Sequence, residues 1–152
     1  MKNDITLNDL YPEIINKLNS GGEFRFTPNG ISMYPMLSDG ENEVVIGKAE
    51  DISVGDVVLC KTEDGGFILH RVDEIRNGGY ILRGDNLLKR EGIFNKDSVV
   101  GKMLGYYKNG KYISANSRYY IRYTKTTLPL HRLKLRIKRK CSQIIKGSKN
   151  GD

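Results

Sequence analysis

The chain is poor in the residues that cross-link small proteins or bind metals. Among its 152 residues are two cysteines, two histidines and no tryptophan. Cys60 and Cys141 have neither CxxC spacing nor a histidine cluster beside them, so the sequence predicts no zinc site. Reducing compartments disfavour isolated disulfides, and we expect both cysteines to be free thiols.

Long apolar runs are also missing. The first ten residues, MKNDITLNDL, contain no apolar stretch of the kind found in secretory signals, and no uncharged apolar run approaches the ~18 residues needed to span a bilayer. The sequence therefore predicts a cytoplasmic protein with no membrane-spanning helix. Its length allows one domain with a modest core.

Acidic residues are missing from one part of the chain. The net charge is +7, but residues 118–151 hold eleven Lys and Arg and no acid, whereas residues 1–117 carry a net charge of −3. A basic protein can bind nucleic acid through an extended cationic surface. Here the excess charge belongs to a tail, so no specific nucleic-acid binding is predicted.

Periodicity divides the chain at the same place. A short helix with Leu7, Leu10, Ile14 and Leu18 on one face is expected to end at Gly21 and Gly22. Short β-prone runs separated by turn residues follow from residue 23 to 115 and predict one mainly antiparallel β unit. We assign residues 1–117 to this β domain and residues 118–152 to a basic helical extension.

The extension is expected to form an amphipathic helix that begins at Pro129. Its shared apolar face is Leu130, Leu133, Ile137, Cys141 and Ile144. Three interpretations remain open. Residues 118–146 can attach peripherally to an anionic membrane, at the inner face for a cytoplasmic protein; the apolar stripe can pack on the β body; or the cations can bind RNA or an acidic protein.

Four short sequence boxes carry the functional signal. They are NGISMYPMLSDG around Ser32, GDVV at residues 55–58, LHRV around His70, and RGDN at residues 83–86. In this order they resemble the conserved boxes of the signal peptidase I and LexA-like serine peptidases. The resemblance covers about half of the chain, from Gly30 to Gly101. It implies the twisted β fold of that superfamily and a serine endopeptidase that acts on a peptide or leader.

The resemblance implies Ser32 as the nucleophile and His70 as the general base. Bacterial signal peptidases and LexA use lysine at the second position, and histidine resembles the archaeal and endoplasmic-reticulum branch. A free histidine pKa of ~6.5 suits a base at neutral pH. Asp85, in the GDN box, is implied as the carboxylate that orients the imidazole. This chemistry needs no metal ion or organic cofactor.

Residues beside the nucleophile are expected to shape the oxyanion and substrate region. Backbone N–H groups near Ser32 would stabilise the oxyanion. Some relatives add a hydroxyl two residues before the serine, but this chain has Gly30 there, a position suited to positive φ. Met33, Tyr34 and Pro35 are expected to line the nucleophile.

Each assignment has an ordinary structural alternative. Ser32 can be a turn serine, His70 a buried strand histidine, and Asp85 a turn-forming aspartate. The whole domain can be a peptide-binding module of the same fold that has lost turnover. A LexA-type self-cleaving regulator fits less well, because only about twenty residues precede the β region and they contain no Ala-Gly cleavage dipeptide.

Overall fold

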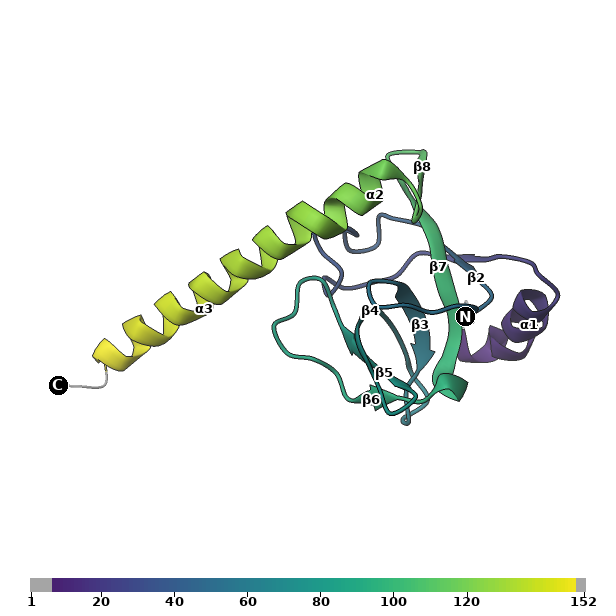
Figure 1. The fold of residues 1–152 in the computed structure, drawn as a ribbon, viewed down its shortest axis with the longest axis horizontal. Coiled ribbons are helices and arrows are strands. Elements are labelled where there is room, and N and C mark those ends of the chain that lie inside the picture. Colours follow the sequence, from purple (N-terminus) through teal and green to yellow (C-terminus); the bar gives the residue numbers. More distant parts are fainter. Residues whose placement is uncertain (1–6, 150–152) are drawn as a thin grey trace, which may run out of the picture.

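The computed structural model describes residues 7–149, with side chains placed as far as residue 145. It is mainly β, as predicted: eight strands form one antiparallel sheet in the order β1-β2-β7-β3-β4-β5-β6, and β8 pairs with β7 (Figure 1). The strands are β1 Phe24–Phe26, β2 Val44–Gly47, β3 Val57–Lys61, β4 Phe67–Arg76, β5 Gly79–Arg83, β6 Ile93–Phe94, β7 Val99–Lys108 and β8 Lys111–Ser114. A short 3₁₀ turn, Lys96–Ser98, precedes β7.

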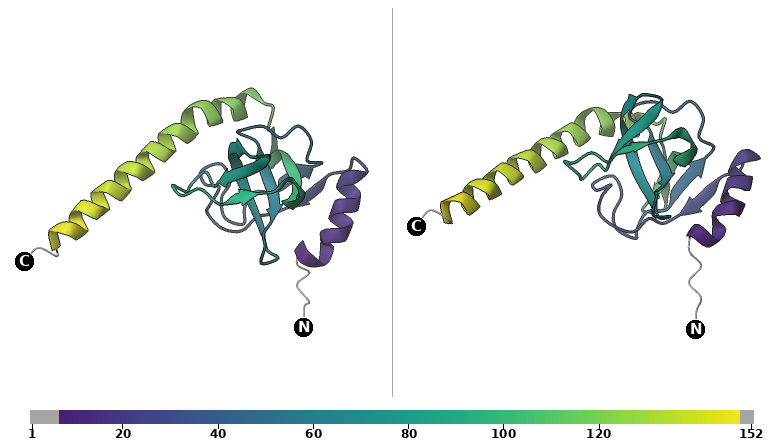
Figure 2. Two further views of the ribbon diagram at one scale, coloured as in Figure 1. Left: turned by 60° about the horizontal axis from the view of Figure 1, so that its bottom comes forward. Right: turned by 90° about the horizontal axis from the view of Figure 1, so that it is seen from below.

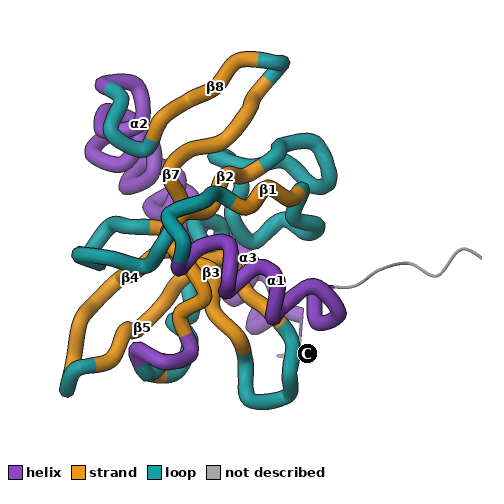
Figure 3. Tube along the Cα trace, turned by 90° about the vertical axis from the view of Figure 1, so that its right-hand side faces the viewer, coloured by secondary structure: helices purple, strands orange, loops and turns teal. Residues whose placement is uncertain are grey.

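The predicted N-terminal helix is present as α1, Leu7–Asn19. Its spacing places Ile14 and Leu18 in the main apolar core, with 3% and 1% of their surface exposed, while Leu7 and Leu10 are partly buried against that core. In Figure 3 α1 lies in front of the strands, and it contacts β1. The helix therefore forms one side of the molecule.

The C-terminal helical segment begins earlier than the sequence predicts. It consists of α2 Arg118–Arg122, a π-helical turn Tyr123–Thr127, and α3 Leu128–Lys149. The Ser117 side chain caps α2 by accepting from the backbone N–H of Tyr120 at 3.2 Å. Pro129 is not the helix start: it lies in the first turn of α3, directly after the π-helical turn, where a missing N–H is tolerated.

The first part of this segment belongs to the core, and the rest leaves the body. Tyr120, Tyr123 and Leu128 are buried with the residues of the β sheet. Beyond them α3 extends away from the β body in both further views (Figure 2). A boundary at residue 117 therefore separates β structure from helix, but it does not separate two packing units.

The cysteine prediction is confirmed. Cys60 and Cys141 are both free, the first buried and the second exposed. Burial raises the pKa of the Cys60 thiol to about 12, which keeps it in the unreactive protonated form.

Candidate active site

The serine loop, residues 27–43, is anchored in the core after Ser32 and is closed on itself by a hydrogen bond from Gly30. Met33, Met36 and Leu37 are almost fully buried in the core. Asp39 accepts the backbone N–H of Gly30 at 2.5 Å, and Gly30 has φ +96°, the positive value expected from its sequence position. These anchors give the half-buried Ser32 a fixed place in a loop that has no regular secondary structure.

The GDN box is in direct contact with this loop. The backbone carbonyl of Ser32 accepts from the N–H of Asn86 at 2.8 Å. A Cβ atom on Gly84 would lie only 2.6 Å from the same carbonyl oxygen, so glycine is required for the close approach. Two boxes that are about fifty residues apart in the sequence are thus adjacent through backbone atoms.

Ser32 and His70 line the same cavity. His70 comes from β4, where it pairs with Val58 of β3, and Ser32 comes from the loop between β1 and β2. The cavity has a volume of about 560 Å³ and includes Gly30 and Met33 in its lining. The structure therefore places the two residues that the sequence proposed as nucleophile and base in the lining of one cavity.

The environment of His70 favours a neutral imidazole. Its side chain is 7% exposed, and burial lowers the pKa of His70, although the nearby Glu91 and Asp85 carboxylates act in the opposite direction. A neutral ring is the form that can accept a proton from a hydroxyl near pH 7.

Glu91 is the carboxylate placed next to the imidazole. Its Oε1 lies 3.5 Å from Nδ1 of His70, and that nitrogen is buried without a hydrogen-bond partner. No motif in the sequence singles out Glu91, because it lies in the irregular segment between β5 and β6. Only the folded backbone, where the Glu91 N–H donates to the carbonyl of Leu82 at 2.8 Å, brings it to β4.

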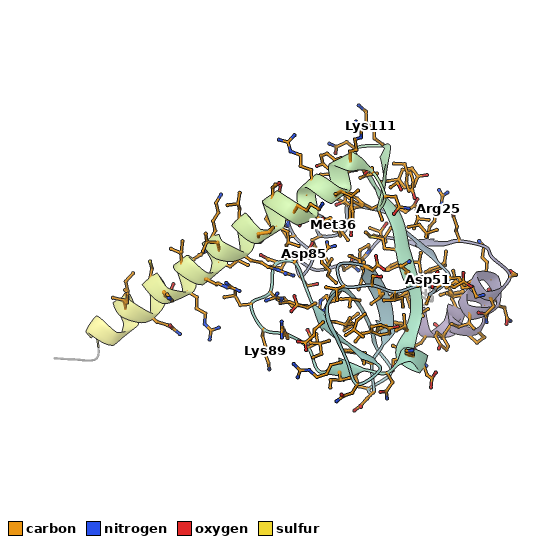
Figure 4. All side chains as sticks on the ribbon, in the orientation of Figure 1. Arg25, Met36, Asp51, Asp85, Lys89 and Lys111 are labelled. Carbon is orange, nitrogen blue, oxygen red and sulfur yellow. The ribbon has the colours of Figure 1, made fainter. Side chains whose placement is uncertain are left out.

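Asp85 is fully buried and bound to arginine. Arg71 donates through Nε at 2.8 Å and through Nη2 at 2.7 Å, and the Tyr123 hydroxyl donates at 3.0 Å. No hydrogen bond between Asp85 and His70 is present among the described residues. Figure 4 shows Asp85 below the helical segment, with Met36 nearby. The carboxylate implied by the family boxes therefore holds a buried ion pair, and Glu91 occupies the place beside the imidazole.

Arg71 connects this ion pair to the rest of the fold. Its Nη1 donates to the carbonyl of Gly55 and to the hydroxyl of Tyr120, both at 2.7 Å. Arg132 of α3 adds a cation 3.8 Å from Asp85. The Nη2 of Arg71 also donates to Sδ of Met36 at 3.5 Å, so all four predicted boxes meet at one guanidinium group.

Tyr34 and Pro35 do not line the cavity with Ser32 in the described part of the chain. Tyr34 is 47% exposed, and its ring packs edge-on against His131 of α3 with 5.9 Å between centroids. The Nε2 of His131 is 2.9 Å from the side-chain oxygen of Asn86. These contacts join α3 to the serine loop and to the GDN box.

Residues 7–149 contain no cluster of three or more His, Cys, Asp or Glu side chains suited to a metal ion. No helix within that range has the length and apolarity to cross a membrane. A scan against protein-family models and a search of curated proteins found no match to this chain.

Proposed function

We propose that the protein is a serine endopeptidase of the signal peptidase type that cleaves a small peptide or leader. The observation that carries this proposal is the shared cavity, which is lined by Ser32 of the serine loop and by a largely buried histidine from a separate element. The order of the four boxes along an antiparallel sheet supports the finer proposal of a LexA-like and signal-peptidase-like fold.

In the proposed reaction Ser32 Oγ attacks the carbonyl carbon of the scissile bond and transfers its proton to His70. The tetrahedral oxyanion is stabilised by backbone N–H groups of the serine loop. His70 then returns the proton to the leaving amine, and an acyl-enzyme remains on Ser32. Water, deprotonated by the same imidazole, hydrolyses this ester. Glu91 stabilises the imidazolium that forms twice in the cycle, because its carboxylate is the one beside Nδ1.

A fluorophosphonate probe tests the proposal directly, since it labels a serine only when a base activates the hydroxyl. We expect labelling of the wild-type chain, and loss of labelling in Ser32→Ala and in His70→Gln. Ser38→Ala is the matched control, because Ser38 lies in the same loop and does not line the cavity. Equal labelling of wild type and Ser32→Ala would overturn the proposal. A folded wild type that stays unlabelled yet binds peptides would favour the non-catalytic binding module.

We further propose that residues 118–146 attach the enzyme to an anionic membrane surface. The supporting observation is the direction of the apolar stripe on α3. Leu130, Leu133 and Ile137 are 59%, 51% and 53% exposed, so about half of each side chain or more stays uncovered by the β body, although Leu133 and Ile137 share a groove with Leu88. The helix instead contacts the body through a different face, which carries Leu128, His131 and Arg132.

Basic side chains flank the exposed stripe on both sides. At 100° per residue, Lys134 and Lys138 fall on one side, and Arg136 and Lys140 on the other. A helix with this pattern binds the boundary between lipid headgroups and acyl chains, and each cation near an anionic surface adds about 1 kcal/mol. The free apolar face and its cationic flanks therefore suit a phospholipid surface better than nucleic acid, which would use only the charge.

Flotation with phosphatidylglycerol-containing vesicles tests the attachment. We expect the wild-type chain to float with these vesicles and to remain behind with pure phosphatidylcholine. Replacing both Leu133 and Ile137 by Asp should abolish flotation, whereas Val54→Asp, at a 61% exposed site on the body, should not. Equal flotation of all three chains would overturn the proposal. A wild-type chain that does not bind vesicles, but binds duplex RNA whether or not Leu133 and Ile137 are replaced, would also overturn it.

A further inference from the structure

The cavity that holds Ser32 and His70 extends well beyond them. Part of its lining comes from α1 through Leu7 and Leu10, and another part comes from β1 and the loop that follows it. The base is formed by β3 and β4. A volume of about 560 Å³ falls within the range of ligand pockets, roughly 300–1,000 Å³. The space is much larger than the methyl group of an alanine can fill.

Aromatic rings dominate the wall from β1. Phe24 and Phe26 lie on one face of the strand, and their rings are stacked with 5.7 Å between centroids and 17° between planes. Phe67 at the start of β4 lies on the base of the cavity and contacts Tyr11 of α1. All three phenylalanines are only partly buried, so part of each ring remains available to a ligand.

Charge is almost absent from the lining. Arg25 is its one charged side chain among the described residues. By strand alternation Arg25 points away from the face that carries Phe24 and Phe26, and its guanidinium lies 3.7 Å from the Glu43 carboxylate. No carboxylate lines the cavity, so a basic substrate side chain would find no counter-ion there.

From this combination of size, aromatic lining and missing charge, we infer that the site selects peptides with a bulky apolar side chain, of leucine or phenylalanine size, near the bond that is cut. The inference rests on the proposed function for the position of that bond. It names the chemical class of the substrate, an apolar peptide segment in which Ala, Ser or Gly at the same position is a poor replacement. An apolar pocket discriminates by roughly 10- to 200-fold per methylene in kcat/KM, so the preference should be large.

Two measurements on the full chain test the inference. The first is kcat/KM for a set of hexapeptides in which each position in turn is Ala, Leu, Phe, Lys or Asp. We expect Leu or Phe to exceed Ala by at least about 10-fold at one position next to the cleaved bond. The second is the affinity of fluorescein-labelled Leu and Ala peptides for Ser32→Ala, measured by anisotropy, which needs no turnover.

A variant that narrows the cavity complements the peptide measurements. Thr27 is an exposed lining residue just after β1, so Thr27→Trp can intrude on the space without disturbing the core. We expect it to weaken Leu-peptide binding by at least about 10-fold and Ala-peptide binding by much less. Val54→Trp, at an exposed site outside the cavity, is the control. If Thr27→Trp does not fold, Leu10→Trp narrows the same space from α1.

The outcomes separate this inference from the peptidase proposal. A preference for Ala at every position, or Leu and Ala peptides bound equally, would overturn the inference even if the enzyme turns over. Leu-peptide binding that Thr27→Trp reduces, in a chain that cleaves nothing, would uphold the apolar site and reject the peptidase chemistry.

Discussion

At the scale of single residues, the assignment of the carboxylate beside His70 has the clearest consequence. Glu91 raises the pKa of His70 against the larger effect of burial, so Glu91→Gln should lower the pKa of His70 further. A base works only when neutral. The acidic limb of the pH profile of kcat/KM should therefore move to lower pH, while the maximal rate falls by less than the roughly 100-fold expected for loss of the base itself.

NMR titration of the imidazole resonances is the direct measurement, with His131→Gln used to assign the two histidines. Glu41→Gln, an exposed substitution in the serine loop, is the control and should change neither the titration nor the rate. An acidic limb that moves to higher pH would reject the role given to Glu91.

The buried pair of Arg71 and Asp85 makes a second prediction. Asp85→Asn leaves a guanidinium with 4% exposure beside an uncharged amide, and removal of one partner of such a pair costs about 3–5 kcal/mol of unfolding free energy. Replacing both, as Arg71→Met with Asp85→Leu, should cost less than Arg71→Met or Asp85→Leu alone. Urea denaturation of these two single variants and the double variant measures this, and strictly additive losses would contradict it.

The Asp85→Asn variant also tests whether Asp85 has a structural or a catalytic role. If Asp85 acts mainly through Arg71, fluorophosphonate labelling of folded Asp85→Asn should persist at a temperature well below its midpoint. Labelling abolished in a fully folded Asp85→Asn chain would instead return Asp85 to the catalytic role that the family boxes imply.

The sequence indicated Ser32 and His70 because short boxes carry them, and both residues do line one cavity. It could not indicate Glu91, which reaches β4 only through the path of the chain after β5. Nor could it separate the two interpretations of Asp85. Whether an aspartate after a strand faces an imidazole or a guanidinium depends on which of two adjacent strand residues it meets, His70 or Arg71.

At the scale of elements, the strands and α1 follow from periodicity, but the C-terminal segment does not. Pro129 is a strong helix-start signal, so the sequence does not predict the helix that precedes it. That helix is capped by Ser117 and continues through a π-helical turn. The apolar stripe of α3 was correctly placed on one face. What faces that stripe is a tertiary property, and here the body leaves it largely exposed, with Leu88 beside Leu133 and Ile137.

Truncation tests the division of the C-terminal segment. A chain ending at residue 117 loses the buried Tyr120, Tyr123 and Leu128, together with the hydroxyls that contact Arg71 and Asp85. We expect a loss of more than about 3 kcal/mol, the range for deleting large core side chains. A chain ending at residue 136 keeps these groups and should retain nearly the full unfolding free energy. Equal stability of the two truncated chains, measured by thermal and urea unfolding, would show that residues 118–128 are dispensable.

At the scale of the whole molecule, α3 is both the proposed membrane-binding surface and a neighbour of the serine loop. Its inner face holds His131 against Asn86 and Tyr34, while its outer face carries the apolar stripe. If the outer face binds a membrane, the serine loop is held close to that surface. A substrate on the same membrane then meets the enzyme at a raised effective concentration, whereas a free peptide gains nothing.

The last prediction compares those two substrates. One leucine-containing peptide is supplied free in solution or fixed by an acyl chain to phosphatidylglycerol vesicles. The double replacement of Leu133 and Ile137 by Asp should lower cleavage of the anchored peptide by at least about 10-fold and leave cleavage of the free peptide unchanged, because linked binding events commonly gain 10²- to 10⁴-fold. Val54→Asp should cleave both forms like the wild type.

Raising the salt concentration should reproduce the defect in the wild-type chain, since the cationic flanks are exposed and therefore screened. A double variant that loses activity equally on both substrates would mean that the stripe supports the catalytic loop itself rather than a membrane contact.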